Sequence, residues 1–121
     1  MQPKFRRLAN AALLLLVISG ASVVTLAQSA PRRIEITASQ FSFAPGDITL
    51  KKGQPVLLVL KSQDVAHGLR VRELNVALKV QEHGTTQVQF TPQKAGDFVG
   101  HCFVFCGKGH GSMVLTFHVV N

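Results

Sequence analysis

The sequence predicts an all-β sandwich or barrel. Short apolar segments recur along most of the chain with turn-forming residues between them, and no segment of useful length has helical periodicity. The last segment alternates, because Leu115, Phe117 and Val119 are apolar. Thr116 and His118 between them are polar, so one face of this strand is expected to be buried. Many short strands at close spacing are typical of sandwiches and barrels, and 121 residues are enough for one such domain.

The N-terminal residues differ from the rest of the chain. Lys4, Arg6 and Arg7 precede residues 8–27, which carry no charge. A basic head before an apolar run is typical of a cleaved export signal, yet this run is also long enough to span a bilayer, so both interpretations stay open. Either way the remainder is expected outside the cytoplasm, in the periplasm or at the outer face of the cytoplasmic membrane. We predict one hydrophobic helix within residues 1–27, a linker at 28–33 and a single domain at 34–121.

Turn signals divide the predicted domain into strands. Pro45 and Gly46 interrupt the chain after the first strand, and Lys52-Gly53-Gln54 forms a turn after the second. Pro55 then opens an apolar run suited to a central strand, because proline is tolerated at the first residue of a strand. The predicted strands are residues 33–37, 48–51, 55–61, 67–72, 76–80, 86–90, 96–102 and 113–120.

The charge of the domain is mildly positive. Without the basic head, ten basic residues remain against six acidic ones, a net charge of +4. This balance is a weak indication of an acidic partner or an anionic membrane surface. The basic residues stand singly or in pairs and are not interleaved with aromatic residues, so no nucleic-acid partner is expected.

The residues that can carry chemistry gather in one twelve-residue window. It contains both cysteines of the chain, Cys102 and Cys106, together with His110 and Met113, and its glycines favour a flexible loop. His67 adds a second imidazole upstream. Thiols, imidazoles and a thioether are soft or borderline ligands, which suit copper rather than calcium or magnesium. The sequence therefore predicts a copper site.

The same residues permit other arrangements. Two cysteines in an oxidising compartment are by default a disulfide. A mononuclear blue-copper site needs one Cys, two His and an axial Met, and it would leave Cys102 as a free thiol exposed to oxidation. If both cysteines bind metal, their sulfurs can be shared by two copper ions, with one histidine on each ion. Met113 and a backbone carbonyl between the cysteines, with Val104 as the central candidate, would then take the axial positions.

The pattern Cys102-x-x-x-Cys106-Gly-x-x-His110-x-x-Met113, with Asp64-Val-x-His67-Gly upstream, resembles the CuA domain of cytochrome c oxidase subunit II. Within that family the resemblance is greatest to the short subunit II of bacterial B-type (ba3-like) oxidases, and the CuA domain of nitrous-oxide reductase is a more distant relative. The resemblance implies a cupredoxin-like Greek-key β-sandwich or barrel. It also implies a mixed-valence dinuclear copper centre that accepts one electron at a time.

The resemblance also implies a ligand set for two copper ions. In that set the two cysteines bridge the ions, each histidine binds one ion, the methionine is axial and Val104 offers its backbone carbonyl. Many family members have Glu at the position of Val104, and its carboxylate reaches a magnesium site, a link that is lost here. The positions that match the ligands of the family are His67, Cys102, Val104, Cys106, His110 and Met113.

The implied partners are an electron donor, either a cytochrome c or another cupredoxin, and oxidase subunit I, with the membrane as a further partner if the N-terminal segment is retained. The chain has no Trp and no Tyr, so the aromatic cluster through which many subunit II proteins take electrons is missing. An apolar docking surface is expected instead from four phenylalanines, which are Phe41, Phe43, Phe103 and Phe105.

The function expected from these residues is one-electron transfer, as part of a terminal oxidase or as a standalone exported carrier. The alternatives are a periplasmic mononuclear copper protein, a copper chaperone and a thiol–disulfide protein. No enzyme activity is expected of the chain alone, because the protein fills every copper position. His83, His101 and His118 are expected at the solvated surface, and Asp64 is expected to orient the loop that presents His67.

Overall fold

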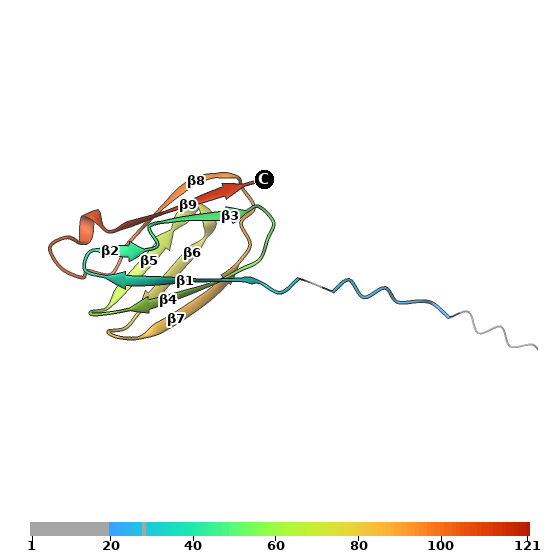
Figure 1. Ribbon diagram of the computed structural model, residues 1–121, viewed down its shortest axis with the longest axis horizontal. Helices are drawn as coiled ribbons and strands as arrows, with labels where there is room; N and C mark the ends of the chain where they lie inside the picture. The colour runs from blue at the N-terminus through green and yellow to red at the C-terminus, as the bar shows by residue number, and fades with distance from the viewer. Residues whose placement is uncertain (1–19, 28) are drawn as a thin grey trace, which may run out of the picture.

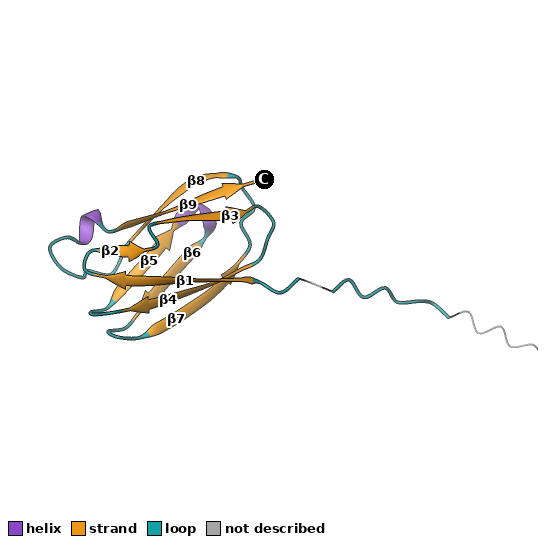
Figure 2. Ribbon diagram, in the orientation of Figure 1, coloured by secondary structure: helices purple, strands orange, loops and turns teal. Residues whose placement is uncertain are grey.

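The computed structural model describes residues 20–27 and 29–121. Within these residues, strands form nearly all of the regular structure, and helical structure is limited to two single-turn segments (Figure 2). The elements are β1 (Arg32–Ser39), β2 (Ser42–Ala44), β3 (Asp47–Lys51), β4 (Val56–Ser62), β5 (His67–Val71), η1 (Arg72–Leu74), β6 (Val76–Val80), β7 (Thr85–Phe90), β8 (Gly96–His101), η2 (His110–Ser112) and β9 (Val114–Val120).

The strands form two sheets that pack face to face (Figure 1). One sheet has the strand order β2-β1-β4-β7 and the other has the order β3-β9-β8-β5-β6. Most neighbours are antiparallel, but β1 pairs with β4 and β3 pairs with β9 in parallel. The predicted all-β sandwich is confirmed.

All eight predicted strands are present, and their ends differ from the prediction by at most two residues. The strand missing from the prediction is β2, which has only three residues and pairs with the end of β1. Three residues are too few to show the alternation of apolar and polar side chains that identifies a strand.

The core lies between the sheets and is built from the alternate side chains that each strand turns inward. On β9, Leu115, Phe117 and Val119 are buried, as the alternation in the sequence predicts. The ring of Phe90 on β7 meets that of Phe117 edge to face, with the ring centres 6.2 Å apart. Contacts of this kind join the two sheets and hold the strand ends, and therefore the loops between them, in fixed positions.

The N-terminal hydrophobic helix was predicted for a segment that lies mostly outside the described residues, because residues 1–19 and 28 are not described. Residues 20–27 have neither helix nor strand and are exposed. Among residues 20–27 and 29–121, no helix combines the length and the apolar character needed to cross a membrane. The boundaries proposed for the leader, the linker and the domain remain predictions.

Three loops meet at one end of the sandwich. The main-chain N–H of Gln40, just after β1, donates a hydrogen bond to the carboxylate of Asp64 in the β4–β5 loop. The side-chain amide of Gln40 donates a second hydrogen bond to the carbonyl oxygen of Cys106 in the β8–β9 loop. Residues far apart in the sequence are therefore brought together here, and this end carries the predicted ligands.

Candidate metal centre

Strand ends and one loop supply the predicted ligands. His67 is the first residue of β5 and is completely buried. Cys102 follows β8 directly, Met113 precedes β9 directly, and both are buried. Cys106 lies in the loop between these strands and is also buried. Anchoring at strand ends fixes the positions of His67, Cys102 and Met113 before any ion binds.

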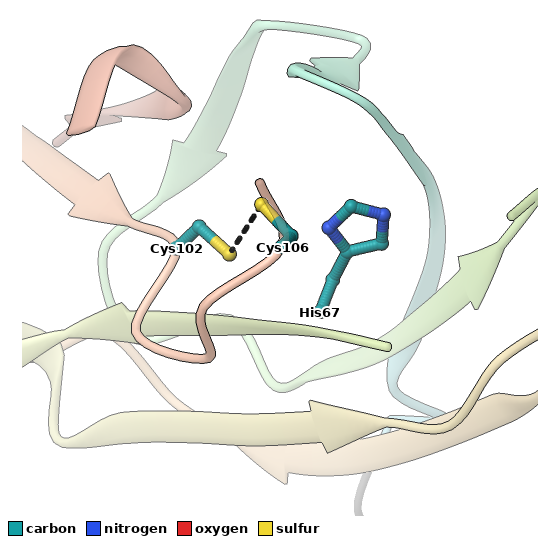
Figure 3. A group of neighbouring side chains, drawn as sticks. All are labelled: His67, Cys102 and Cys106. Atoms are coloured by element: carbon teal, nitrogen blue, oxygen red, sulfur yellow. Dashed lines mark hydrogen bonds between the residues drawn. The ribbon is translucent and has the colours of Figure 1, made fainter. Parts of the chain in front are cut away.

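Both cysteines are free thiols, and their side chains point toward each other and toward the ring of His67 (Figure 3). The two sulfur atoms are 3.9 Å apart. One donor atom from each of His67, Cys102 and Cys106 lies within 4.8 Å of the other two. Donor atoms this close together can bind the same metal ion, and a buried cluster of soft donors suits copper.

The other predicted ligands adjoin this group. His110 Nδ1 lies 3.7 Å from Cys106 Sγ, and Met113 Sδ lies 3.8 Å from the same sulfur. The thiol of Cys102 donates to the carbonyl oxygen of Val104, with the sulfur 3.2 Å from the oxygen. The structure therefore brings all six predicted donors into one contiguous cluster.

The orientation of the His67 ring follows from its hydrogen bond. Its Nε2–H donates to Asp64 Oδ1, 2.6 Å away, while the main-chain N–H of Val65 donates to the same oxygen. Burial alone would raise the pKa of Asp64, but the hydrogen bonds from Gln40, His67 and Val65 together hold this pKa below its ordinary value. Asp64 is therefore a carboxylate, and it keeps the proton of His67 on Nε2. The predicted orienting role of Asp64 is present in this geometry.

The second ring nitrogen of His67 is left without a partner. Nδ1 is buried and has no hydrogen bond among the described residues. Figure 3 shows this side of the ring turned toward the cysteines. A buried polar atom without a partner costs about 1–3 kcal/mol of stability, and such atoms are rare in folded proteins. A bound metal ion would satisfy this atom, so the residues present fit copper.

Burial also acts on the thiol of Cys106. Desolvation, followed by the neighbouring Cys102, raises the pKa of Cys106 to about 11. Cysteine binds metal as a thiolate, so the thiol loses its proton when an ion enters. A buried thiolate is costly unless a cation is beside it, and a copper ion would supply that charge.

The loop that carries Cys106 is held by close packing. Gln40 Nε2 donates to the Cys106 carbonyl at 2.7 Å. Gly107 has φ +135°, and a Cβ there would lie 2.8 Å from the ring of Phe41, while a Cβ on Gly109 would overlap the same ring. The glycines were expected to make the loop flexible, but here they let it pack directly on Phe41.

Sequence reasoning missed two residues at this site. Gln40 lies 66 positions from Cys106 in the sequence, so no local sequence pattern predicts their hydrogen bond. Gly68 follows His67, and a Cβ there would lie 2.8 Å from the ring of Phe103. The His-Gly pair in the sequence was a signal that backbone approaches closely at this point.

The remaining histidines lie at the surface. His83 and His101 are exposed, as predicted. His118 is less free than expected, because its Nδ1 lies 2.7 Å from Asp97 Oδ1 and its Nε2 lies 2.8 Å from Asp47 Oδ1. The carboxylates of Asp47 and Asp97 raise the pKa of His118 above its ordinary value.

Comparisons with known proteins agree with this fold. The family described as "Cupredoxin-like domain" matches residues 8–115. Cytochrome c oxidase subunit 2 of Thermus thermophilus is 28% identical over 83 residues, which are 69% of this chain and 62% of that protein. Nitrous-oxide reductase of Cupriavidus necator is 33% identical over 84 residues, 66% of this chain and 13% of that protein.

Among solved structures, the periplasmic domain of subunit II of cytochrome oxidase of Bradyrhizobium japonicum has the same fold. The TM-score is 0.69 at 18% identity, over 77% of this chain and 86% of that one. The chain spans less than two thirds of the length of the curated oxidase relative named above. The match of the family to residues 8–115 covers most of the sequence. This chain therefore belongs to the cupredoxin-like domain family, and cytochrome c oxidase subunit 2 is among its relatives.

Proposed function

We propose that this protein holds two copper ions between Cys102 and Cys106 and transfers one electron at a time. The observation that carries the proposal is the buried, unpartnered Nδ1 of His67, which faces two free thiols. The relationship to cytochrome c oxidase subunit 2 and to nitrous-oxide reductase supports the same conclusion.

The proposed ligands divide into three kinds. The thiolates of the two cysteines and the Nδ1 atoms of the two histidines would be the main donors to the ions. The Met113 sulfur and the Val104 carbonyl oxygen would be weaker donors. When bound, a copper pair would supply a site that accepts and releases one electron with little change in its bonds to these residues. The full set is His67, Cys102, Val104, Cys106, His110 and Met113.

The protein contributes rigidity and exclusion of water. Asp64 fixes the orientation of the His67 ring, and Gln40 fixes the backbone at Cys106. His67, Cys102 and Met113 are preset at strand ends, so little rearrangement would accompany electron transfer. The surrounding apolar side chains keep water from reorganising around the site. Two thiolates nearly neutralise the copper charge, which makes the buried position tolerable.

The position of Cys102 favours two ions over one. A mononuclear blue-copper site would use His67, Cys106, His110 and Met113 and would leave Cys102 without a role. Yet the Cys102 sulfur lies inside the cluster, 3.9 Å from the Cys106 sulfur, and the residue is buried. A copper chaperone needs accessible ligands for exchange, whereas His67, both cysteines and Met113 are buried.

We further propose that the protein works on the outer side of the cytoplasmic membrane, as the electron-entry domain of a terminal oxidase. The relatives named cytochrome c oxidase subunit 2, and the periplasmic domain of similar fold, support this location. The proposed partners are an electron-donor protein, either a cytochrome c or a cupredoxin, and the oxidase subunit that accepts the electron. A leader that is cut and an anchor that is retained are both compatible with this placement.

Copper stoichiometry and electron spin resonance test the proposal. We expect two copper ions per chain and, in the oxidised protein, a spin coupled equally to both copper nuclei. Cys102→Ser should bind one ion or none, because one of the two bridges is lost, whereas Val104→Ala should keep both ions because any residue offers a carbonyl. A single ion in the wild-type protein, or two ions retained in Cys102→Ser, would contradict the proposal.

A further inference from the structure

A surface feature on the five-stranded sheet adjoins the loop between β8 and β9, here called the metal-binding loop. Phe103, between Cys102 and Val104, folds back over β5 on the outer face of the five-stranded sheet. Gly68 makes room for it, because a Cβ at that position would lie 2.8 Å from the Phe103 ring and 2.9 Å from a methyl group of Val104. The ring is thereby seated on the sheet, one residue from a proposed copper ligand.

Two cations flank this ring. The guanidinium carbon of Arg70 lies 4.3 Å from the ring centre, and Lys79 Nζ lies 5.8 Å from it. Their positions follow from the sheet register, in which Gly68 is opposite Lys79 and Arg70 is opposite His101. Outward-facing residues of neighbouring strands thus surround Phe103, and cation–π contacts of this kind hold long side chains in place.

The surface continues into a shallow groove. Its volume is about 430 Å³, and it adds a third cation to the two beside the ring. Val99, which is 44% exposed, gives the groove an apolar patch next to the cations. The residues that line the groove are Arg70, Arg72, Glu73, Val99, His101 and Phe103.

The positive charge here is not neutralised within the described part of the chain. Among residues 20–27 and 29–121, no ion pair includes Arg70, Arg72 or Lys79. Lys61 on the other sheet, by contrast, is paired with Glu35 at 3.0 Å. Glu73 is the one carboxylate that lines the groove. A cluster of unpaired cations around an aromatic ring is complementary to an acidic surface.

We propose that this surface, the Phe103 face, docks an acidic patch of a redox protein that exchanges electrons with the metal centre. The inference rests on the proposed electron-transfer function and names the chemistry of its partner. Arginine and aromatic residues are typical of the central contacts of interfaces, and complementary charge speeds encounter. Docking here places the partner against Phe103, and the loop backbone leads from Phe103 directly to Cys102.

Small charged reductants test whether the positive charge of the Phe103 face attracts anionic electron donors. The oxidised, copper-loaded protein is mixed with anionic iron(II)–EDTA or cationic hexaammineruthenium(II), each of which gives one electron to the centre and is itself oxidised by one. In Arg70→Glu/Lys79→Glu, the rate with iron(II)–EDTA at low ionic strength should fall on the order of tenfold, and the rate with hexaammineruthenium(II) should rise.

The matched control is Lys51→Glu/Lys52→Glu, which changes the net charge equally. These residues lie at the end of β3 and in the turn after it, where the main-chain N–H of Lys52 donates to the carbonyl oxygen of Val120 at the end of β9 remote from Met113. The control should change both rates much less. Equal effects of the two double variants would overturn the proposal. The milder Arg70→Gln/Lys79→Gln should give a smaller change in the same direction.

Binding of an acidic polypeptide tests the docking itself. Isotope-labelled protein in the reduced, copper-loaded form is titrated with poly-glutamate, and amide shifts are followed by nuclear magnetic resonance. Shifts should concentrate at residues 68–72, 79 and 99–103, weaken with added salt and disappear in Arg70→Glu/Lys79→Glu. Shifts spread over other faces would overturn the proposal, and so would binding only to phosphatidylglycerol vesicles.

Copper content and the spin signal are measured on every variant. Two ions with an unchanged spin signal and no change in rate or binding would reject the docking surface alone. Absence of a two-copper spin signal in the wild-type protein would instead reject the proposed function itself.

Discussion

At the scale of single residues, the hydrogen bond between His67 and Asp64 decides which ring nitrogen is available to a metal. Asp64 holds the proton on Nε2, which leaves Nδ1 as a lone-pair donor facing the thiols. Asp64 also receives the N–H groups of Gln40 and Val65, so its carboxylate is fixed from several sides. One carboxylate thus sets both the chemistry of the ligand and the position of its loop.

Asp64→Ala should weaken both copper retention and the fold. The buried Nε2–H of His67 loses its acceptor, and an unsatisfied buried group costs about 1–3 kcal/mol. Copper affinity should fall about 10–100-fold, in line with the loss of groups that orient metal ligands. Chelator competition measures the affinity, and urea unfolding measures the stability.

Asp64→Asn is the matched control for this change, because its amide oxygen can still accept the proton of Nε2. It should retain most of the affinity and most of the stability. Equal losses in the alanine and asparagine variants would show that the charge of Asp64, rather than the hydrogen bond, supports the site.

At the scale of elements, His118 links three neighbouring strands of the five-stranded sheet through hydrogen bonds to two carboxylates. His118 on β9 contacts Asp47 at the start of β3 and Asp97 on β8. With a carboxylate at each nitrogen, both ring nitrogens can donate hydrogen bonds only when the ring is protonated. β8 and β9 lead into and out of the metal-binding loop, so this contact lies on the two strands that support the loop.

The contribution of His118 to stability should depend on pH. The folded-state pKa is raised, so the stabilisation is fully present below the unfolded value of about 6.5 and is lost as the pH rises through the folded value. The stability difference between wild type and His118→Gln should therefore be larger at pH 6 than at pH 9 in urea unfolding.

Removing one carboxylate checks the cause of this effect. In an Asp97→Asn background, replacing His118 by Gln should produce a smaller change with pH, because only Asp47 still raises the histidine pKa. A difference between wild type and His118→Gln that grows from pH 6 to pH 9 would contradict the assignment.

At the scale of the whole molecule, the sandwich depends on side chains buried between the sheets. Leu58→Ala on β4 removes a completely buried side chain and should cost about 2–5 kcal/mol. Val120→Ala, at a residue that is 49% exposed, should change the stability by no more than about 0.5 kcal/mol. Urea unfolding of both variants measures the difference, and similar losses would mean that Leu58 is not a core residue.

The strands, and the candidate donors that the structure brings together, were predicted from the sequence because both leave local patterns. The alternation in β9 identifies a buried face, and the donor types between Cys102 and Met113 identify a copper-binding window. The parallel pairs β1–β4 and β3–β9 leave no such pattern, because register between distant strands depends on the whole sandwich. The sequence did not predict the contact of Gln40 with Cys106 or the packing of Phe103 on Gly68, because these residues are far apart in the sequence.

The direction of β1 has a practical consequence. This strand of eight residues ends at the metal-binding loops, since Gln40 directly after it bonds to Cys106. At about 3.3 Å per residue, Arg32 lies roughly 25 Å away, at the other end of the sandwich. Protein attached to an electrode or a bead through a site before Arg32 should therefore present its redox-active pole outward, where freely diffusing molecules can reach it.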